Sequence, residues 1–300
     1  MTDIVIIFGA TASGKSQTAI QLAKQFLAEK KTPVIINADA LQQYSDLPIL
    51  SAQPKQYDKD ICCHRLYGFL PADSNNDVAS WLGRAMAEIT NGFLKNKIPI
   101  VVGGSGLYIK TLLIGLSPMP AVPQAIKNQM IKTINATPEK LIDYYQQLEI
   151  HDPTTAKKLA KNDKARIIRA LSIFIASQKP LSEWQALPPI GGLKDKFPEK
   201  KITYHHLMPP REILWNNITH RTSAMLADGV LEEYKIFLQH YHKKNLPIKK
   251  TIGAKSIEQY LAHKIDKSEL QQHITIATRQ YAKRQATWYR GQLHDIFENG

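Results

Sequence analysis

An eight-residue segment near the N-terminus constrains the fold of this chain more than any other feature. It matches the pattern G-x-x-x-x-G-K-[ST] and consists of Gly9, Ala10, Thr11, Ala12, Ser13, Gly14, Lys15 and Ser16. The glycines allow the backbone to curl so that its N–H groups point at phosphate oxygens, and a helix starting there adds a positive dipole. In such a loop the lysine contacts the terminal phosphate, and the final hydroxyl is a ligand for Mg²⁺. The segment therefore predicts a phosphate-binding loop, without specifying ATP.

Apolar runs and helical periodicity on either side of this loop indicate an α/β fold. Short apolar runs at 3–8, 33–37 and 98–104 are predicted to be buried strands. Segments 15–29 and 77–95 have helical spacing of their apolar residues and are predicted to connect these strands. Strands that alternate with helices in this way pair in parallel, with helices on both faces of the sheet.

Ligands of parallel sheets bind beyond the carboxyl ends of the strands. The phosphate loop, Asp39 and the turn 103–105 all follow predicted strands and should meet at that edge. Asp39 has three open roles there, as a general base, as a Mg²⁺ ligand or as the N-cap of a helix.

The middle of the chain has a different character. Residues 117–123 are rich in proline, 124–178 carry helical patterns without a strand-like run, and 186–198 form a second loop rich in proline and glycine. A strand pattern resumes at 202–208. We therefore predict an inserted all-helical domain at 120–198, within a core formed by 1–119 and 199–300.

The chain is basic, with 39 Lys and Arg against 26 Asp and Glu and a formal net charge of +13. The window 242–290 alone carries 11 Lys and Arg against three acids. On a helical wheel of ~100° per residue, an apolar stripe contains Leu270, Ile274, Ala277, Tyr281 and Trp288, and Arg279, Lys283 and Arg290 lie on the opposite face. This basic face is either an ordinary solvated surface or a surface for a polyanion such as RNA.

The cysteines and the length of the apolar runs indicate the cellular compartment. The two cysteines, Cys62 and Cys63, are adjacent and do not form a disulfide framework, which favours a reducing environment. No apolar run approaches the ~20 residues of a membrane-spanning helix. We predict a cytoplasmic protein without a membrane partner.

These patterns leave several functions open. A kinase, a nucleotidase and a group transferase all fit a phosphate loop with a helical insertion and a basic C-terminal region. An ATP-dependent kinase of a small molecule explains residues 9–16 equally well but leaves the basic tail unexplained. An RNA-binding protein whose phosphate loop is a structural relic is the alternative without catalysis.

Seven motifs, in one order, resemble the family of tRNA dimethylallyltransferases, also called isopentenyl-diphosphate:tRNA isopentenyltransferases. The phosphate loop and the segment 277–290 (ATRQYAKRQATWYR) are the strongest matches. The others are 39–44 (DALQQY), 103–108 (GGSGLY), Asp152-Pro153 with 162–171 (NDKARIIRAL), Arg211 with Arg221-Thr222, and Gly253 with Lys255. Ala10, Ala40 and Ala254 depart from the family pattern, which usually has proline, serine and an aromatic residue there. The resemblance covers nearly the whole chain.

The resemblance implies a P-loop NTPase-like parallel sheet core with an inserted helical domain. It implies transfer of a dimethylallyl group from dimethylallyl diphosphate to the exocyclic amine of the adenosine 3′-adjacent to the anticodon, in tRNAs that read codons beginning with U. By the same resemblance Mg²⁺ assists, Ser16 is its ligand, and Asp39 is the base. Lys15, Thr11 and Arg221 are implied to act on the diphosphate with the loop 9–16.

The resemblance further implies a monomer that grips the tRNA anticodon stem-loop. The implied RNA-binding residues are Asp39, Ala40, Leu41, Gln42, Ser105, Lys127, Ala165, Arg166, Ile167, Ile168, Arg169, Lys250, Gly253, Lys255, Arg279, Lys283, Arg284, Gln285, Thr287, Trp288 and Arg290. The basic bias of 242–290 supports the C-terminal members of this set independently.

Overall fold

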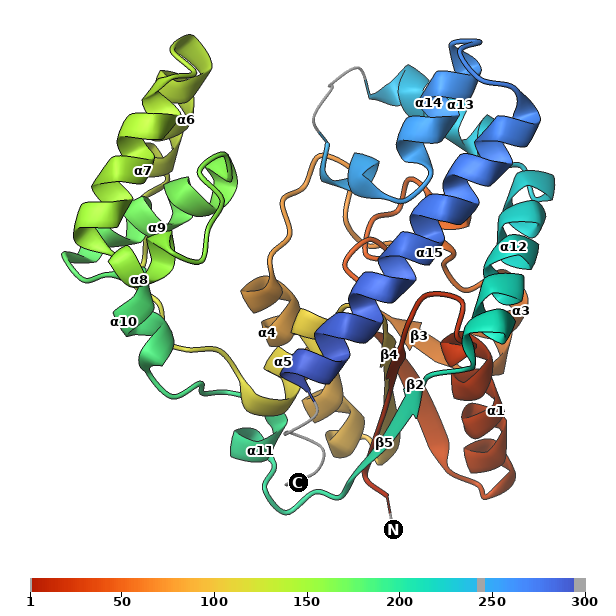
Figure 1. Cartoon of the computed structure of the whole chain (residues 1–300). Helices are drawn as coiled ribbons and strands as arrows, with labels where there is room; N and C mark the ends of the chain where they lie inside the picture. Colours follow the sequence, from red (N-terminus) through yellow and green to blue (C-terminus); the bar gives the residue numbers. More distant parts are fainter. Residues whose placement is uncertain (1, 242–245, 294–300) are drawn as a thin grey trace. The chain divides into compact units, whose positions relative to one another are not determined.

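The structure is a computed structural model that describes residues 2–241 and 246–293 (Figure 1). The chain divides into two compact units. The first, here called the core unit, consists of 1–113 and 197–300, and the second, the insert unit, of 114–196. The predicted insertion at 120–198 overlaps the insert unit closely. Residues 242–245 of the basic window lie outside the described residues.

The core unit contains a five-stranded sheet in which every neighbouring pair is parallel. Its order is β3-β2-β4-β1-β5, and its strands are β1 (Ile4–Gly9), β2 (Thr32–Asn37), β3 (Cys63–Arg65), β4 (Lys97–Gly103) and β5 (Ile202–Leu207). This sheet confirms the predicted α/β fold class. Only β3 was not predicted, because three residues are too few to show a period.

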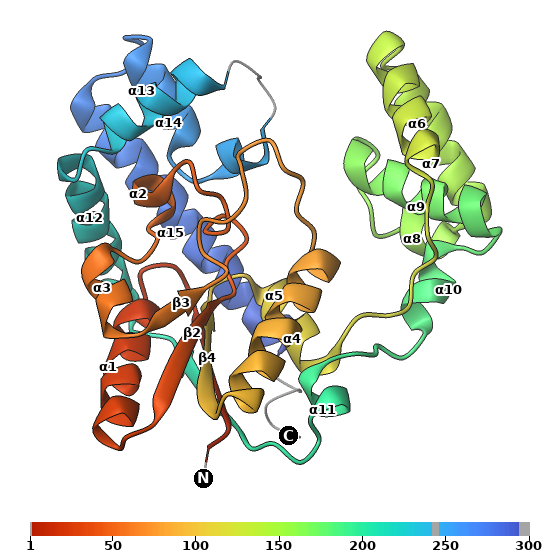
Figure 2. The same cartoon turned by 180° about the vertical axis from the view of Figure 1, so that it is seen from behind.

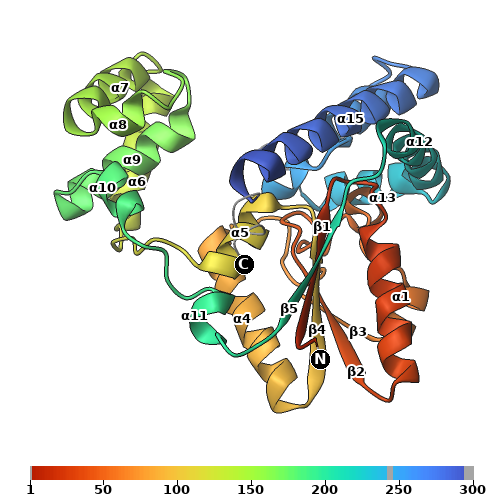
Figure 3. The ribbon, with the colours of Figure 1, turned by 60° about the horizontal axis from the view of Figure 1, so that its bottom comes forward.

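Helices cover both faces of this sheet because its strands are apolar on both sides. Helix α1 (Lys15–Ala28) packs Ala19 and Ala23 against the face that carries Val5 and Ile7. Helix α4 (Val78–Leu94) contacts β2 and β4 from the other face, as Figure 3 shows. Its Trp81 is fully buried and donates its indole N–H to the carbonyl of Asn37.

Further helices complete the core unit. They are α2 (Pro48–Ser51), α3 (Gln56–Ile61), α5 (Gly106–Ile114), α12 (Arg211–Ala227), α13 (Val230–His240), the 3₁₀ helix η1 (Pro247–Lys250), α14 (Ala254–Leu261) and α15 (Lys267–Gln292). Figures 1 and 2 show α15 as one long helix beside α12, and Figure 3 shows it crossing the end of the sheet. A second apolar cluster, which includes Tyr234, Phe237 and Ile257, joins α13 and α14 to α15.

The insert unit consists of helices, most of which pack around an apolar cluster of their own. They are α6 (Gln124–Ala136), α7 (Lys140–His151), α8 (Pro153–Ala156), α9 (Lys164–Ser177), α10 (Leu181–Ala186) and α11 (Leu193–Lys196). Leu148, Ile167 and Leu171 are among the buried residues of this cluster. An antiparallel bridge between Leu116 and Ile190 closes the base of the unit.

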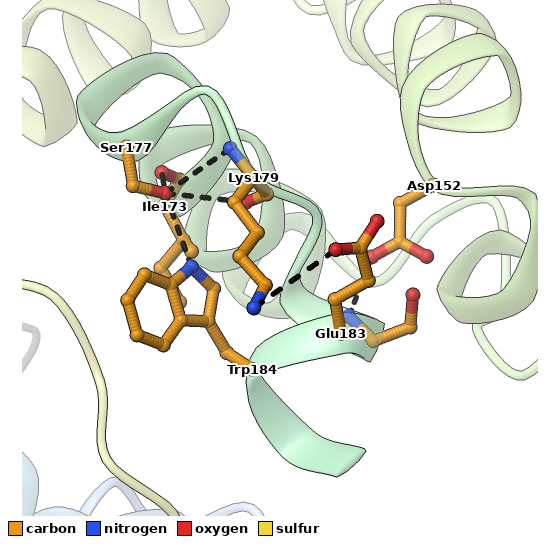
Figure 4. Close-up of polar contacts among 7 residues, drawn as sticks. Asp152, Ile173, Ser177, Lys179, Glu183 and Trp184 are labelled. Carbon is orange, nitrogen blue, oxygen red and sulfur yellow. Dashed lines mark hydrogen bonds and ion pairs between the residues drawn. The ribbon is translucent and has the colours of Figure 1, made fainter. Parts of the chain in front are cut away.

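A buried carboxylate organises the turns of the insert unit (Figure 4). Asp152 is 2% exposed and caps α8 by accepting hydrogen bonds from the amide and hydroxyl of Thr155. It also accepts from the amide of Ser182, in the first turn of α10. Nearby, the Ser177 hydroxyl accepts from the Trp184 indole and from the amide of Lys179.

Candidate active site

The phosphate loop begins where β1 ends and leads directly into α1. Gly9 is required there, because a Cβ atom would lie 2.3 Å from the carbonyl oxygen of Leu207 on the neighbouring strand. Gly14 precedes α1 with φ +92°, a backbone conformation that suits glycine. Ala12 also has positive φ, at 61°, although it has a side chain. The loop therefore has the curled backbone that the sequence predicted.

Lys15 is folded back over this loop. Its Nζ donates a hydrogen bond to the carbonyl oxygen of Ala10 at 2.6 Å. Burial lowers the pKa of Lys15 to about 8, while the carboxylate of Asp39 raises it and Arg221 lowers it further. A phosphate anion entering the loop would meet this ammonium group in surroundings poor in water, where charge–charge attraction is strong.

Helix α12 supplies two further groups to the loop. Arg221 donates from Nη1 to the hydroxyl of Thr11 at 2.8 Å. Asn217, one helical turn earlier on the same face, donates to the carbonyl of Ala12 at 3.1 Å. Burial lowers the pKa of Arg221, and Asp39 opposes that shift. The resemblance predicted Arg221 at the diphosphate site, and the structure places it beside the loop.

Asp39 lies in the loop that follows β2. One carboxylate oxygen accepts a hydrogen bond from the amide of Leu41 at 3.0 Å, and Asn37 holds the Asp39 backbone on both sides. Because no helix begins here, the helix N-cap role is wrong for Asp39. The neighbouring amide of Ala40 donates to the hydroxyl of Ser105, which follows β4.

Two cavities meet at these residues. The first, of about 460 Å³, is lined by the loop residues Thr11, Lys15 and Ser16 together with residues of α12. The second, of about 290 Å³, lies toward η1 and α15. Thr11, Asp39, Ser51 and Arg221 line both cavities. The two cavities therefore share a carboxylate, two hydroxyl groups and a guanidinium group.

The second cavity combines apolar walls with a basic rim. Its apolar lining includes Leu41, Leu50, Met225, Ile252 and Ile274. Lys250 and Arg284, both exposed, also line it, as does Tyr281. Burial and the Asp39 charge raise the pKa of Tyr281 to about 12, so its hydroxyl keeps its proton at neutral pH. Such a cavity suits a flat apolar group attached to a polyanion.

A divalent metal ion would find few protein ligands here. Among the described residues, no group of three or more His, Cys, Asp or Glu is placed to hold a metal ion. The oxygen atoms that line the first cavity include the Ser16 hydroxyl and the Asp39 carboxylate. This set fits Mg²⁺, which accepts a few protein oxygens when phosphate and water supply the rest.

The predicted RNA-binding residues divide by exposure. Those with exposed side chains are Ala165, Arg166, Arg169, Lys250, Lys255, Lys283, Arg284, Thr287 and Arg290. Asp39, Ala40, Leu41, Gln42, Ser105, Lys127 and Trp288 are partly buried. Ile167 and Ile168 are wrong as side-chain contacts, because both pack in the apolar cluster of the insert unit. Gly253 is likewise buried, where it begins α14.

Two residues of α15 also differ from the prediction. Gln285 is 6% exposed, and the oxygen and the nitrogen of its side-chain amide both form hydrogen bonds within the protein. Its side chain therefore does not face RNA. Arg279 donates to the hydroxyl of Thr219 and lies over the ring of Trp215, so its guanidinium packs on α12. The prediction placed Arg279 on an open face with Lys283, and the docking of α12 explains the difference.

The buried stripe of α15 also differs from the predicted one. Leu270 and Ile274 are buried as expected, but the stripe continues through Thr278, Ala282, Gln285 and Tyr289. The wheel assigned apolar residues to the inside, whereas buried carbonyl groups here require Gln285 and the Tyr289 hydroxyl. Asn217, which lies four residues before Arg221 on the same face of α12, was not predicted as a site residue.

Comparisons with known proteins bear on the whole chain. A family model described as IPP transferase matches residues 42–292, and one described as isopentenyl transferase matches residues 2–67. A tRNA dimethylallyltransferase of Nitrobacter hamburgensis is 36% identical over 294 residues, covering 98% of this chain and 89% of the relative. One of Pelagibacter ubique is 37% identical over 290 residues, covering 97% and 89%. The solved structure of a eukaryotic dimethylallyltransferase acting on tRNA matches with a TM-score of 0.79 at 26% identity, covering 96% of this chain and 70% of that one.

Proposed function

This chain belongs to the IPP transferase family, and on that premise we propose that it is an enzyme that transfers a dimethylallyl group to tRNA. The donor is dimethylallyl diphosphate, and the acceptor is the exocyclic amine of an adenosine. The family resemblance supports the adenosine 3′-adjacent to the anticodon, in tRNAs that read codons beginning with U, as the target.

The observation that carries this proposal is that Thr11, Asp39 and Arg221 line both cavities. A diphosphate bound in the phosphate loop would direct its attached carbon toward these side chains. An adenine in the second cavity would approach them from the opposite side. The two substrates would thus meet at the only carboxylate that lines both of these cavities.

Asp39 is suited to act as the general base. The adenine amine is a weak nucleophile because its lone pair is delocalised into the ring. In the reaction the amine nitrogen forms a bond to the first carbon of the dimethylallyl group, and the bond from that carbon to the diphosphate oxygen breaks. The amine proton passes to the Asp39 carboxylate, and a positioned base of this kind contributes about 10²–10⁴-fold to the rate.

The leaving diphosphate gains negative charge as its bond to carbon breaks. With the diphosphate bound in the loop, Lys15, Arg221, the Thr11 hydroxyl and the loop amides would surround the position where that charge develops. Fixed donors at such a position stabilise the transition state more than the ground state. Mg²⁺ held by the Ser16 hydroxyl and by diphosphate oxygens would supply additional positive charge.

RNA would enter from the basic rim of the second cavity. Enzymes that react with a base take it out of the stack, and a single-stranded loop makes this least costly. Lys250 and Arg284 lie where they could contact the phosphates on either side of such a base. No helix among the described residues has the length and apolarity needed to cross a membrane. The cytoplasmic location and the monomeric state stay predictions.

The test is a transfer assay with purified protein, Mg²⁺, radiolabelled dimethylallyl diphosphate and unmodified tRNA. We expect label in the RNA, at an adenosine of the anticodon loop, and none when EDTA removes the metal ion. Replacing that adenosine by guanosine in a synthetic stem-loop is the matched control and should abolish labelling. Phosphoryl transfer from ATP to a small acceptor, with no labelling of RNA, would support the kinase alternative. Binding of tRNA without either reaction would support the RNA-binding alternative.

A further inference from the structure

The side chain of Gln285 joins α15 to two loops at the end of the sheet. Its Oε1 accepts a hydrogen bond from the amide of Thr11 at 2.8 Å, in the phosphate loop. Its Nε2 donates to the carbonyl of Gly104 at 2.6 Å, in the loop after β4. Gln285 is 6% exposed. A buried amide with both ends hydrogen-bonded has a fixed orientation, so a shift of the helix that carries it also shifts the loops to which it is bonded.

The group that Gln285 holds is one edge of the Ala10–Thr11 peptide. A peptide unit is planar, so fixing the direction of its N–H also fixes the direction of its carbonyl. That carbonyl, on Ala10, accepts the hydrogen bond from Lys15 Nζ at 2.6 Å. The Thr11 hydroxyl, on the same short segment, accepts from Arg221 at 2.8 Å. Gln285 is therefore one peptide away from both cations of the diphosphate site.

The same turn of α15 carries exposed cations. Lys283 and Arg284 directly precede Gln285 and face solvent, while Gln285 faces the loops. One continuous helix spans Lys267–Gln292. Because a helix is stiff over one turn, binding of RNA phosphates by the two cations would also hold in place the backbone that carries Gln285.

We propose that Gln285 is a positioning residue that couples RNA binding on α15 to diphosphate binding in the loop. It orients the Ala10–Thr11 peptide and, through that peptide, Lys15 and Arg221. Docked RNA fixes α15 and so prearranges the loop for the diphosphate. The coupling half of this inference rests on the proposed function, since it requires RNA on α15.

The test measures binding of inorganic pyrophosphate with Mg²⁺ to the full chain by calorimetry. Each titration is run without RNA and with saturating unmodified tRNA anticodon stem-loop. In the unaltered protein we expect RNA to tighten pyrophosphate binding at least about fivefold, within the usual range of coupling between sites. In Gln285→Met, which has similar size but no hydrogen-bonding amide, we expect binding about tenfold weaker without RNA, as two hydrogen bonds are lost. In this variant, RNA should no longer change the affinity for pyrophosphate.

Two control variants separate positioning from helix docking. Gln280→Met places the same substitution on an exposed position of α15 and should leave both affinities unchanged. Tyr289→Phe removes a buried hydroxyl that lies within hydrogen-bonding distance of the carbonyls of Gly104 and Gly9, but it leaves the Ala10–Thr11 peptide bonded to Gln285. It should retain the coupling. Loss of coupling in Tyr289→Phe equal to that in Gln285→Met would overturn the specific role of Gln285.

Further readouts exclude a purely structural role. In the transfer assay, Gln285→Met should raise the KM for dimethylallyl diphosphate, while the affinity for tRNA measured by filter binding without the diphosphate stays unchanged. An equal loss of RNA affinity would overturn the proposal and make Gln285 an RNA contact. If Gln285→Met does not fold, hydrogen exchange in the unaltered protein decides: RNA should slow exchange of the amides in 9–16, and no change overturns the coupling. Failure of the unaltered protein to label tRNA would contradict only the proposed function, because pyrophosphate binding does not depend on transfer.

Discussion

Arg221 and Thr11 are 210 residues apart in the chain, and the guanidinium of the first donates to the hydroxyl of the second at 2.8 Å. This contact joins α12 to the phosphate loop. It also places a cation and a hydroxyl at the boundary between the two cavities. The chemistry of this boundary can be tested one group at a time.

Thr11→Ala should lower kcat/KM for transfer by about 10²-fold, the usual effect of deleting one group that stabilises developing charge. The substitution removes the acceptor that holds Arg221 in place. Thr11→Ser keeps the hydroxyl and should stay within a few-fold of the unaltered enzyme. Steady-state kinetics with varied dimethylallyl diphosphate measure both. Equal activity of the two variants would mean that the hydroxyl has no part in the reaction.

Asp39→Asn is expected to depress transfer by about 10²–10⁴-fold while tRNA affinity stays the same. Asparagine retains an oxygen that can accept from the amide of Leu41, so the loop after β2 should keep its shape. In the proposed reaction, asparagine cannot take a proton from the adenine amine. Single-turnover labelling and filter binding of tRNA give the two quantities. A variant that binds tRNA tightly and still transfers at the original rate would remove Asp39 from the mechanism.

The phosphate loop and the sheet could be predicted because short-range rules determine both. The apolar runs that form β1, β2 and β4 are bounded on both sides by loop residues. The glycine pattern of 9–16 predicts one structure, a loop whose backbone curls around a phosphate. The position of Asp39 beside the loop followed from parallel pairing alone. The short strand β3 could not be predicted, since Cys63–Arg65 pairs only because β2 offers a free edge.

The orientation of α15 shows what sequence patterns leave out. The family resemblance assigned Gln285 to the RNA-binding residues together with the neighbouring cations. In the structure, Gln285 is inside because the carbonyl of Gly104 and the amide of Thr11 need partners there. Those two groups belong to segments that lie 181 and 274 residues away in the chain. A pattern that considers only neighbours along one helix therefore cannot predict these two hydrogen bonds.

The basic face of α15 should be visible in the salt dependence of tRNA binding. Each phosphate contact that is lost lowers the slope of log K against log salt concentration by about one. We expect this change for Lys283→Ala, whose side chain is exposed beside Arg284. Lys24→Ala removes an exposed cation from α1 and is the matched control. Equal slopes for both variants, measured by filter binding, would place the RNA elsewhere.

The insert unit should lose stability in acid because of Asp152. Burial raises the pKa of this carboxyl, but the hydrogen bonds from Thr155 and Ser182 outweigh burial and hold the pKa below its ordinary value. The folded state therefore binds fewer protons than the unfolded state near pH 4, and the stabilisation that is present above this pH is lost as the pH falls. Asp152→Asn should lower the free energy of unfolding by about 2 kcal/mol at neutral pH, the effect of losing hydrogen bonds to a charged group.

Urea unfolding followed by circular dichroism, repeated from pH 7 downward, measures this difference. The gap between the unaltered protein and Asp152→Asn should close as the pH falls below the ordinary pKa of an aspartate and through the lowered pKa of Asp152, because both then carry an uncharged side chain. Asp163→Asn is the control, since Asp163 caps α9 on the surface and accepts from the amide of Arg166 at 3.2 Å. Its effect should be about 1 kcal/mol or less, as expected for a surface helix cap. A gap for Asp152→Asn that stays constant with pH would show that shape, rather than charge, makes Asp152 necessary.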